Sequence, residues 1–174
     1  MVNTFFEHRV NRLFDLAEQI EKVFSAAGLE YRVAGGLAVY LYVEEAKPDA
    51  GRLTRDIDIA VRREDLEAIA AAVRPFRLEY RHVAGIDMLM QEGENSARRA
   101  VHLIFNLILG AARNIRGIRL IPLEDLVRIK LTSFRLIDQA HLKDIEEARL
   151  ITPEIEANLP AILRNRLILI RKTE

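Results

Sequence analysis

Two aspartates, Asp56 and Asp58, stand one residue apart in the apolar run Thr54-Arg55-Asp56-Ile57-Asp58-Ile59-Ala60-Val61. Because the side chains of a strand alternate between its faces, both carboxylates lie on one face and the β-branched residues cover the other. The carboxylates are then about 7 Å apart, within reach of one hard cation. Aspartate is unfavourable in strands, so the pair suggests a metal site, with a solvated edge strand as the alternative.

A pair of glycines, Gly35 and Gly36, lies upstream of the aspartates. Leu29, Tyr31 and Val33 alternate before the pair as a strand would, and an apolar, helix-compatible segment follows it. A strand, a glycine pair and a helix start can hold an anion, because the backbone approaches a phosphate closely and free N–H groups point outward. Most glycine pairs are turns. Followed by an Asp-Ile-Asp strand, this pair predicts a phosphate cradle beside a cation site, which metal-dependent nucleotidyl transfer requires.

This combination resembles the signature of the DNA-polymerase-β-like nucleotidyltransferase superfamily. A later segment is similar to the AbiEii-type branch, which includes nucleotidyltransferase-like toxins of bacterial toxin–antitoxin and phage-defence systems; it comprises residues 122–131, Arg135, Asp138 and residues 141–145. The resemblance covers residues 29–150. It implies an α+β fold, a mixed β-sheet flanked by helices with a helical C-terminal part. It also implies an enzyme that moves a nucleoside monophosphate from an NTP to an RNA or protein hydroxyl.

The residues and the resemblance together predict individual roles. Asp56 and Asp58 hold the metal, Mg²⁺ or Mn²⁺, and are catalytic together with Lys130 and His102. The nucleotide- and phosphate-binding group comprises Gly35, Gly36, Thr54, Arg55, Lys130, Arg135 and Asp144.

Lys130 also stands out on physical grounds, because it falls in the apolar stripe of its predicted helix together with Leu126, Val127 and Phe134. A buried lysine must extend to solvent or meet a charge, since burying it unpaired is costly. Asp138 projects near the same stripe and offers a structural partner. The alternative, which the resemblance favours, is a cation aimed at the nucleotide phosphates.

His102 stands where the superfamily usually supplies a third carboxylate, in Val101-His102-Leu103-Ile104-Phe105. Magnesium prefers oxygen ligands, so two carboxylates support one metal ion firmly and a second weakly. The histidine could act as a general base for the attacking hydroxyl, or it could be a hydrogen-bonded core residue. Asp87 is a conceivable replacement acid, although nothing in its spacing recommends it. The missing acid leaves open a catalytically reduced protein that binds nucleotide, RNA or a partner protein.

Composition sets further limits. The 174 residues correspond to a single domain, with a sheet-and-helix core over about 1–120 and a helical part over about 121–174. No run approaches a membrane span, the N-terminus lacks a secretory pattern, and the absence of cysteine fits a reducing cytoplasm. Residues 1–96 carry 12 basic and 17 acidic side chains, and residues 97–174 carry 14 and 9. The zero net charge argues against duplex DNA, whereas the basic second half is either a solvated surface or an RNA-facing patch.

The expected elements follow from periodicity and from turn residues. We expect helices over residues 4–27, 36–46, 64–73, 123–137 and 139–148, and strands up to Ala34 and over 56–61, 77–83 and 100–106. Residues 110–117 read as a turn or short insertion, and Thr152-Pro153 opens a final helical stretch that Pro160 breaks. The expected partners are an NTP, possible tRNA or other RNA, and a possible antitoxin protein.

Overall fold

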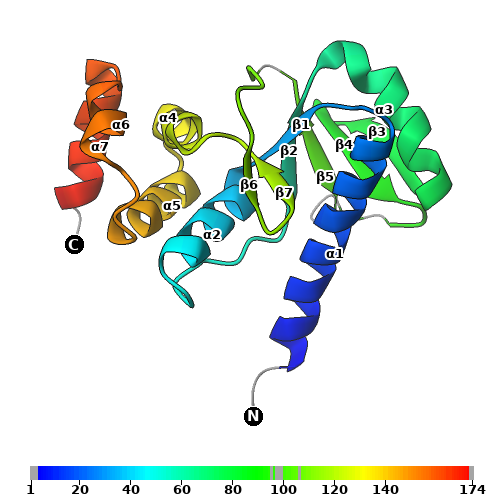
Figure 1. The fold of residues 1–174 in the computed structure, drawn as a ribbon, viewed down its shortest axis with the longest axis horizontal. Coiled ribbons are helices and arrows are strands. Elements are labelled where there is room, and N and C mark those ends of the chain that lie inside the picture. The colour runs from blue at the N-terminus through cyan, green and yellow to red at the C-terminus, as the bar shows by residue number, and fades with distance from the viewer. Residues whose placement is uncertain (1–3, 95, 97–99, 106, 173–174) are drawn as a thin grey trace.

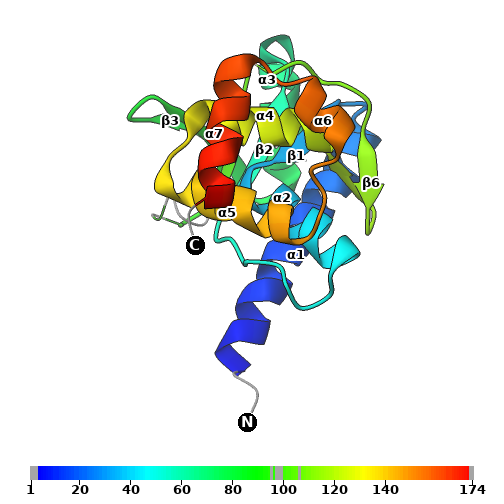
Figure 2. The same ribbon diagram turned by 90° about the vertical axis from the view of Figure 1, so that its left-hand side faces the viewer.

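A seven-stranded mixed sheet forms the centre of the protein, with strand order β3-β4-β5-β2-β1-β7-β6 (Figures 1 and 2). The structure is a computed structural model that describes residues 4–94, 96, 100–105 and 107–172, with side chains described from residue 11 onward. The strands are β1 Tyr31–Ala34, β2 Ile57–Val61, β3 Leu78–Val83, β4 Ile86–Gln91, β5 Val101–Ile104, β6 Arg113–Ile115 and β7 Ile118–Leu120.

Helices lie on both faces of this sheet. They are α1 Thr4–Ala26, α2 Gly35–Ala46, α3 Leu66–Val73, α4 Leu123–Ser133, α5 Leu136–Glu147, α6 Pro153–Ala157 and α7 Ala161–Lys172, with 3-10 turns η1 Arg63–Asp65 and η2 Arg74–Phe76. Figure 2 shows α4 to α7 in front of β1 and β2, and Figure 1 shows α1 and α3 on the other side. None of the helices in the described part of the chain has the length and apolar content that a membrane crossing requires.

The alternation of β1 and β2 gives the sheet two different faces at its centre. Tyr31 packs edge-on against Phe24 of α1, with ring centroids 5.3 Å apart, and pairs with Val61 of β2. The apolar residues of β2 that share this face are fully buried. Ala34 pairs with Asp58 on the opposite face, toward the C-terminal helices. One face of β1 therefore packs against α1 beside the buried apolar face of β2, and the polar face of β2 is left for a site.

Several predicted elements are confirmed. The long first helix ends at Ala26 before Gly28, whose φ is +66°. Thr152 caps α6 by accepting a hydrogen bond from the Ile155 N–H at 3.3 Å, and Pro160 separates α6 from α7. Asp56 lies immediately before β2 instead of inside it.

Two predictions about the second half were wrong. The segment 110–117 is not a simple turn, because residues 113–120 form the hairpin β6–β7 around Arg116 and Gly117, both with positive φ. The helix predicted over 123–137 ends at Ser133, since Phe134 adopts a left-handed conformation with φ +49°. A new helix, α5, then begins at Leu136 instead of residue 139.

The corner between α4 and α5 is built around one buried carboxylate, Asp138, which is 0% exposed. It accepts hydrogen bonds from Lys130 Nζ at 2.9 Å, Arg135 Nε at 2.8 Å and Ser133 Oγ at 2.7 Å. It also accepts from the backbone N–H of Arg135, the N-cap residue of α5, at 3.2 Å. Burial alone would raise the pKa of Asp138, but the hydrogen bonds from Arg135, Lys130 and Ser133 hold it well below its usual range. The ion pair between Lys130 and Asp138 therefore fixes this corner.

Replacing Asp138 by alanine should lower the free energy of unfolding by about 3–5 kcal/mol, because the buried ammonium of Lys130 loses its counter-charge. Urea denaturation measures the loss. The matched control is Asp125→Asn on α4, which removes an ion pair to Arg128 that is more than one-third exposed on both sides. That change should cost less than about 1 kcal/mol. Equal effects of the two substitutions would contradict the structural role of Asp138.

The same carboxylate predicts a dependence on pH. The folded-state pKa of Asp138 is depressed, so its contribution is complete above its unfolded pKa of about 4 and is lost as the pH falls below that value. The stability gap between the parent and Asp138→Asn should therefore narrow on acidification below about pH 4. A gap that stays constant or widens there would show that another group carries the effect.

Candidate functional site

The start of α2 lies against the carboxylate of Asp58. Gly35 has φ +63°, and a Cβ added to it would stand 1.9 Å from Asp58 Oδ2. Glycine is therefore required twice at this position, by the left-handed backbone and by the close approach. The N-cap residue is Ala34, which supplies no side-chain cap, and the first turn of α2 carries no acidic residue. An uncapped helix start beside a carboxylate can bind a phosphate together with a cation.

The second glycine faces a different pair of side chains. A Cβ on Gly36 would lie 2.7 Å from Thr54 Oγ1 and 3.4 Å from His141 Cε1. Thr54 comes from the loop before β2, and His141 comes from α5, where it is 5% exposed. The glycine turn is thus enclosed by groups that are far apart in the sequence. It joins Thr54, which the sequence analysis assigned to the site, to His141, which it did not.

His102 lies beside Asp58 through the register of the sheet. The parallel pairing of β2 with β5 sets Asp58 opposite His102, and His102 Nδ1 is 3.2 Å from Asp58 Oδ1. The two side chains are 22% and 28% exposed. Asp56 is half-buried, although its Oδ1 atom is enclosed by protein. The histidine therefore occupies the strand position next to the aspartates that the sequence analysis gave it.

Asp87 does not replace the third carboxylate. Met88 pairs with His102, so its neighbour Asp87 points to the other face of β4. There Asp87 accepts a hydrogen bond from the Tyr80 hydroxyl at 2.6 Å and contacts His82 Nδ1 at 2.8 Å. The network at Asp87 is structural and is separate from Asp56 and Asp58.

Lys130 and Arg135, the basic residues predicted to bind the nucleotide phosphates, lie at the corner between α4 and α5. Lys130 is 5% exposed and is bound to Asp138, the pairing that the sequence analysis gave as its structural alternative. The Arg135 side chain is also bound to Asp138 but is 70% exposed. The hydrogen bond to Asp138 raises the pKa of Arg135 most, and the negative charge of Asp58 adds to the rise, so Arg135 lies within electrostatic range of that carboxylate. A phosphate-binding role for Lys130 stays a prediction.

Asp144 and Arg55 are placed less directly. Asp144 accepts two hydrogen bonds from Arg52, at 3.0 Å from Nε and 3.3 Å from Nη2, and so ties the loop before β2 to α5. The Asp144 carboxylate, which the resemblance assigned to nucleotide binding, is therefore already bound to Arg52. Arg55 is exposed in the loop directly before Asp56.

His141 is a residue beside the glycine turn that the sequence did not assign to the site. The buried residues of α5 are Asp138, His141, Leu142 and Ile145, which form one stripe. A polar residue in such a stripe was the signal that drew attention to Lys130, and it applied equally to His141. Its proximity to Gly36 depends on the packing of α5 against the start of α2, which the sequence pattern does not give.

The carboxylates of the candidate site suit a metal ion that binds together with substrate phosphates. The described residues contain no group of three or more His, Cys, Asp or Glu side chains arranged to hold a metal ion. Magnesium is commonly bound by one or two carboxylates together with substrate phosphates and water. Asp58 beside the glycine turn, with Asp56 two residues before it in the sequence, fits that pattern, whereas a closed cage made only of protein ligands does not.

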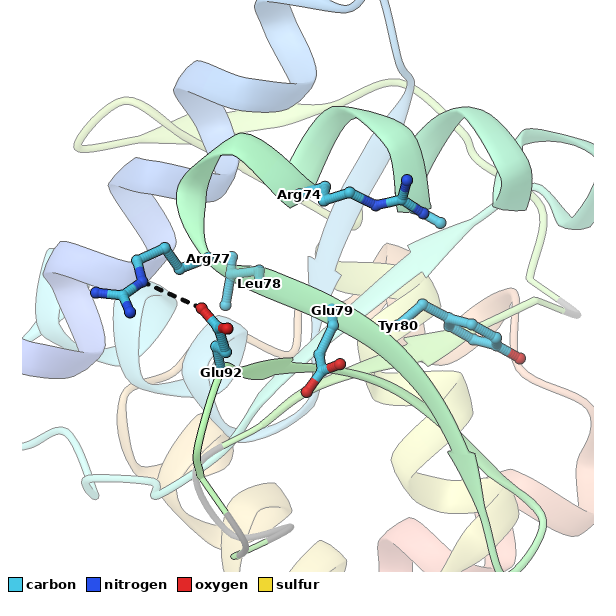
Figure 3. Close-up of a pocket in the computed structure, with 7 residues that line it drawn as sticks. Arg74, Arg77, Leu78, Glu79, Tyr80 and Glu92 are labelled. Carbon is cyan, nitrogen blue, oxygen red and sulfur yellow. Dashed lines mark hydrogen bonds and ion pairs between the residues drawn. The ribbon is translucent and has the colours of Figure 1, made fainter.

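A surface hollow elsewhere is not part of this site. It has a volume of about 440 Å³ and lies at the edge strand β3, with Arg74, Arg77, Glu79 and Glu92 among its lining residues (Figure 3). Arg77 forms an ion pair with Glu92 at 3.2 Å across it. Strands β4 and β5 separate β3 from β2, so the hollow is remote from the aspartates.

Comparison with known proteins agrees with the fold. No family model matches the sequence, and no curated protein matches it either. The crystal structure of an antigenic nucleotidyltransferase-like protein from Paracoccidioides brasiliensis is similar, with a TM-score of 0.62 and 17% identity, covering 94% of this chain and 89% of that chain. The crystal structure of ANT(2'')-Ia in complex with adenylyl-2''-tobramycin gives a TM-score of 0.56 and 14% identity, covering 90% and 95%. These likenesses concern the fold, and the protein has the nucleotidyltransferase-like α+β fold that its sequence predicted.

Proposed function

We propose that the protein is a metal-dependent nucleotidyltransferase that moves a nucleoside monophosphate from an NTP to a hydroxyl group and releases pyrophosphate. The observation that carries this proposal is the contact between the Gly35 backbone and the Asp58 carboxylate at the uncapped start of α2. It places an anion-binding helix terminus and a cation-binding carboxylate side by side. The structural likeness to two nucleotidyltransferase-type proteins supports the same class of reaction.

The residues have distinct tasks in this reaction. The N–H groups at Gly35 and Gly36 bind phosphate oxygens, and the exposed guanidinium of Arg135 offsets phosphate charge. Asp56 and Asp58 would hold Mg²⁺ or Mn²⁺, which would polarise the phosphate and neutralise developing charge when bound. The acceptor oxygen attacks the α-phosphorus, a new P–O bond forms, and the bond to pyrophosphate breaks. His102, beside Asp58, takes the hydroxyl proton as general base.

The acceptor is the less defined part of the proposal. The AbiEii-like segment over 122–145 favours a toxin that modifies tRNA, another RNA or a protein and is held by an antitoxin partner in the cytoplasm. The structurally similar protein ANT(2'')-Ia was crystallised with adenylyl-2''-tobramycin, so a small-molecule hydroxyl belongs in the same assay.

A second candidate is a nucleotidyltransferase-like protein that binds nucleotide or RNA without turnover. It is favoured by His102, which stands in place of a third carboxylate and is hydrogen-bonded to Asp58. The presence of both Asp56 and Asp58 argues for the enzyme, because a scaffold alone has no use for two carboxylates one residue apart at the start of β2.

Calorimetric titration with each NTP, with and without Mg²⁺, tests both candidates at their shared first step. We expect one or more NTPs to bind only with the metal present. Folded protein that binds no nucleotide under either condition would refute the enzyme and the nucleotide-binding form of the second candidate. Incubation with the bound NTP, labelled on its α-phosphate, then separates them, because only the enzyme transfers the label to RNA, to protein or to a small-molecule acceptor.

The Asp58→Asn variant should lose Mg²⁺-dependent nucleotide binding while its thermal stability stays unchanged or rises. The substitution removes one of two neighbouring negative charges in the metal-free protein and keeps an acceptor for His102. The matched control is Glu64→Gln in η1, an exposed acid just after β2, which should bind as the parent does. A stability loss of several kcal/mol would identify Asp58 as structural.

The His102→Asp variant separates the roles of the histidine. If the missing acid limits metal binding, the variant should bind Mg²⁺ more tightly, and the ion at about 100 times its Kd should stabilise it by about 2.7 kcal/mol. His102→Asn is the uncharged control and should gain no more stability from Mg²⁺ than the parent does. A His102→Asp protein that melts far below the parent, without rescue by Mg²⁺, would show that His102 is a core residue.

The His102→Ala variant tests the general base. Its transfer rate should fall by roughly 10²–10⁴-fold while NTP affinity hardly changes. An unchanged transfer rate would show that His102 is not the general base.

A further inference from the structure

One buried polar atom near the glycine turn has no task in the fold. Nδ1 of His141 is enclosed by protein and has no hydrogen-bond partner among the described residues. The whole side chain is 5% exposed. An unsatisfied buried polar atom typically costs stability, and native proteins contain few of them. Such an atom is retained where a ligand completes it.

The position of His141 identifies that ligand. Its Cε1, the atom bonded to Nδ1, lies 3.4 Å from where a Cβ of Gly36 would be. Gly36 is in the first turn of α2, a helix of 12 residues whose N-cap has no side-chain hydrogen bond. The N–H groups of that turn and the imidazole of His141 thus meet at one place, and the side chain of Thr54 borders it. Only hydrogen-bond acceptors, such as phosphate oxygens, satisfy all of these donors together.

The charge state of the imidazole agrees with this role. Burial lowers the pKa of His141 to about 4, and the positive charges of Lys130 and Arg52 act in the same direction against Asp144 and Asp138. At neutral pH the ring is therefore uncharged, with one nitrogen that donates and one that accepts. A neutral donor fits beside a helix N-terminus, where a protonated ring would be repelled.

We infer that His141 is a phosphate-contacting residue, whose imidazole N–H donates a hydrogen bond to the phosphate chain held at Gly35 and Gly36. The inference rests on the proposed function and adds a side chain from within α5 to a site that also draws on α2, β2 and β5. It also gives the loop before β2 a reason to be fastened to α5 by Arg52 and Asp144, since both sides of that contact border the ligand.

Inorganic triphosphate is the probe, because it carries the phosphate chain without base or sugar. The parent should bind it with Mg²⁺ in calorimetry. His141→Phe should bind about tenfold more weakly, the value of one hydrogen bond to a charged group. His141→Asn keeps an amide near the position of Nδ1 and should bind within about threefold of the parent, since a donor is retained.

Stability separates this role from a structural one. Because Nδ1 has no partner among the described residues, His141→Phe should unfold at the same urea concentration as the parent or at a higher one. The matched control is Tyr42→Phe on α2, the helix that begins with Gly35, which removes a buried hydroxyl that donates to the Ile121 carbonyl at 2.8 Å. That change should lower stability and leave triphosphate binding unchanged.

Each outcome decides the inference. A parent that binds triphosphate while His141→Phe binds it equally well would overturn the role of His141 and leave the proposed function intact. A parent that binds neither NTP nor triphosphate would overturn both. If His141→Phe does not fold, nitrogen NMR of the parent decides, with the signal assigned by its absence in His141→Asn. The ring nitrogens of His141 should shift on addition of triphosphate, and an unmoved signal would overturn the inference.

Discussion

The close approach of the Gly35 backbone to the Asp58 carboxylate is the constraint on which the rest of the site depends. A Cβ at Gly35 would lie 1.9 Å from Asp58 Oδ2, so any other residue would displace either the carboxylate or the start of α2. The antiparallel pairing of Ala34 with Asp58 fixes this contact from the sheet side. Because β2 lies between β1 and β5, the glycine turn, Asp58 and His102 fall in one row across three strands.

The row formed by the glycine turn, Asp58 and His102 could be predicted from the sequence because it follows from strand alternation. A period of two along residues 57–61 determines which face carries the aspartates, and the site follows once the glycine turn is placed beside them. The position of His102 also depended on alternation, since it needed only that β5 pair with β2 in register. By contrast, β4 was overlooked because four consecutive residues of Ile86–Gln91 are buried, which removes the alternation that marks a strand.

The remaining errors have conformational causes that periodicity does not contain. Phe134 ends α4 with a positive φ, which is uncommon for an aromatic residue and leaves the apolar stripe of α4 looking continuous with α5. Arg116 also has a positive φ, in the turn between β6 and β7, where Gly117 is the residue whose type indicates a chain reversal. His141 was missed because its neighbours, Gly36 and Thr54, are distant in sequence and meet it only through the packing of α5 on α2.

The α4–α5 corner also suggests how two cations divide their work. Lys130 and Arg135 share the single carboxylate of Asp138, so the three groups together carry one net positive charge. Lys130 is 6% exposed in this pair, and moving its ammonium to a ligand would leave Asp138 with one counter-charge fewer in a buried setting. The side chain of Arg135 is 70% exposed, and the negative charge of Asp58 helps to raise its pKa, so it can turn to a phosphate at little cost. In the proposed reaction, Lys130 would then act chiefly as a positioning residue that keeps Asp138 ionised and α5 in place, and Arg135 would present the charge to the ligand. This division accounts for a lysine inside an apolar stripe without requiring it to leave its buried partner.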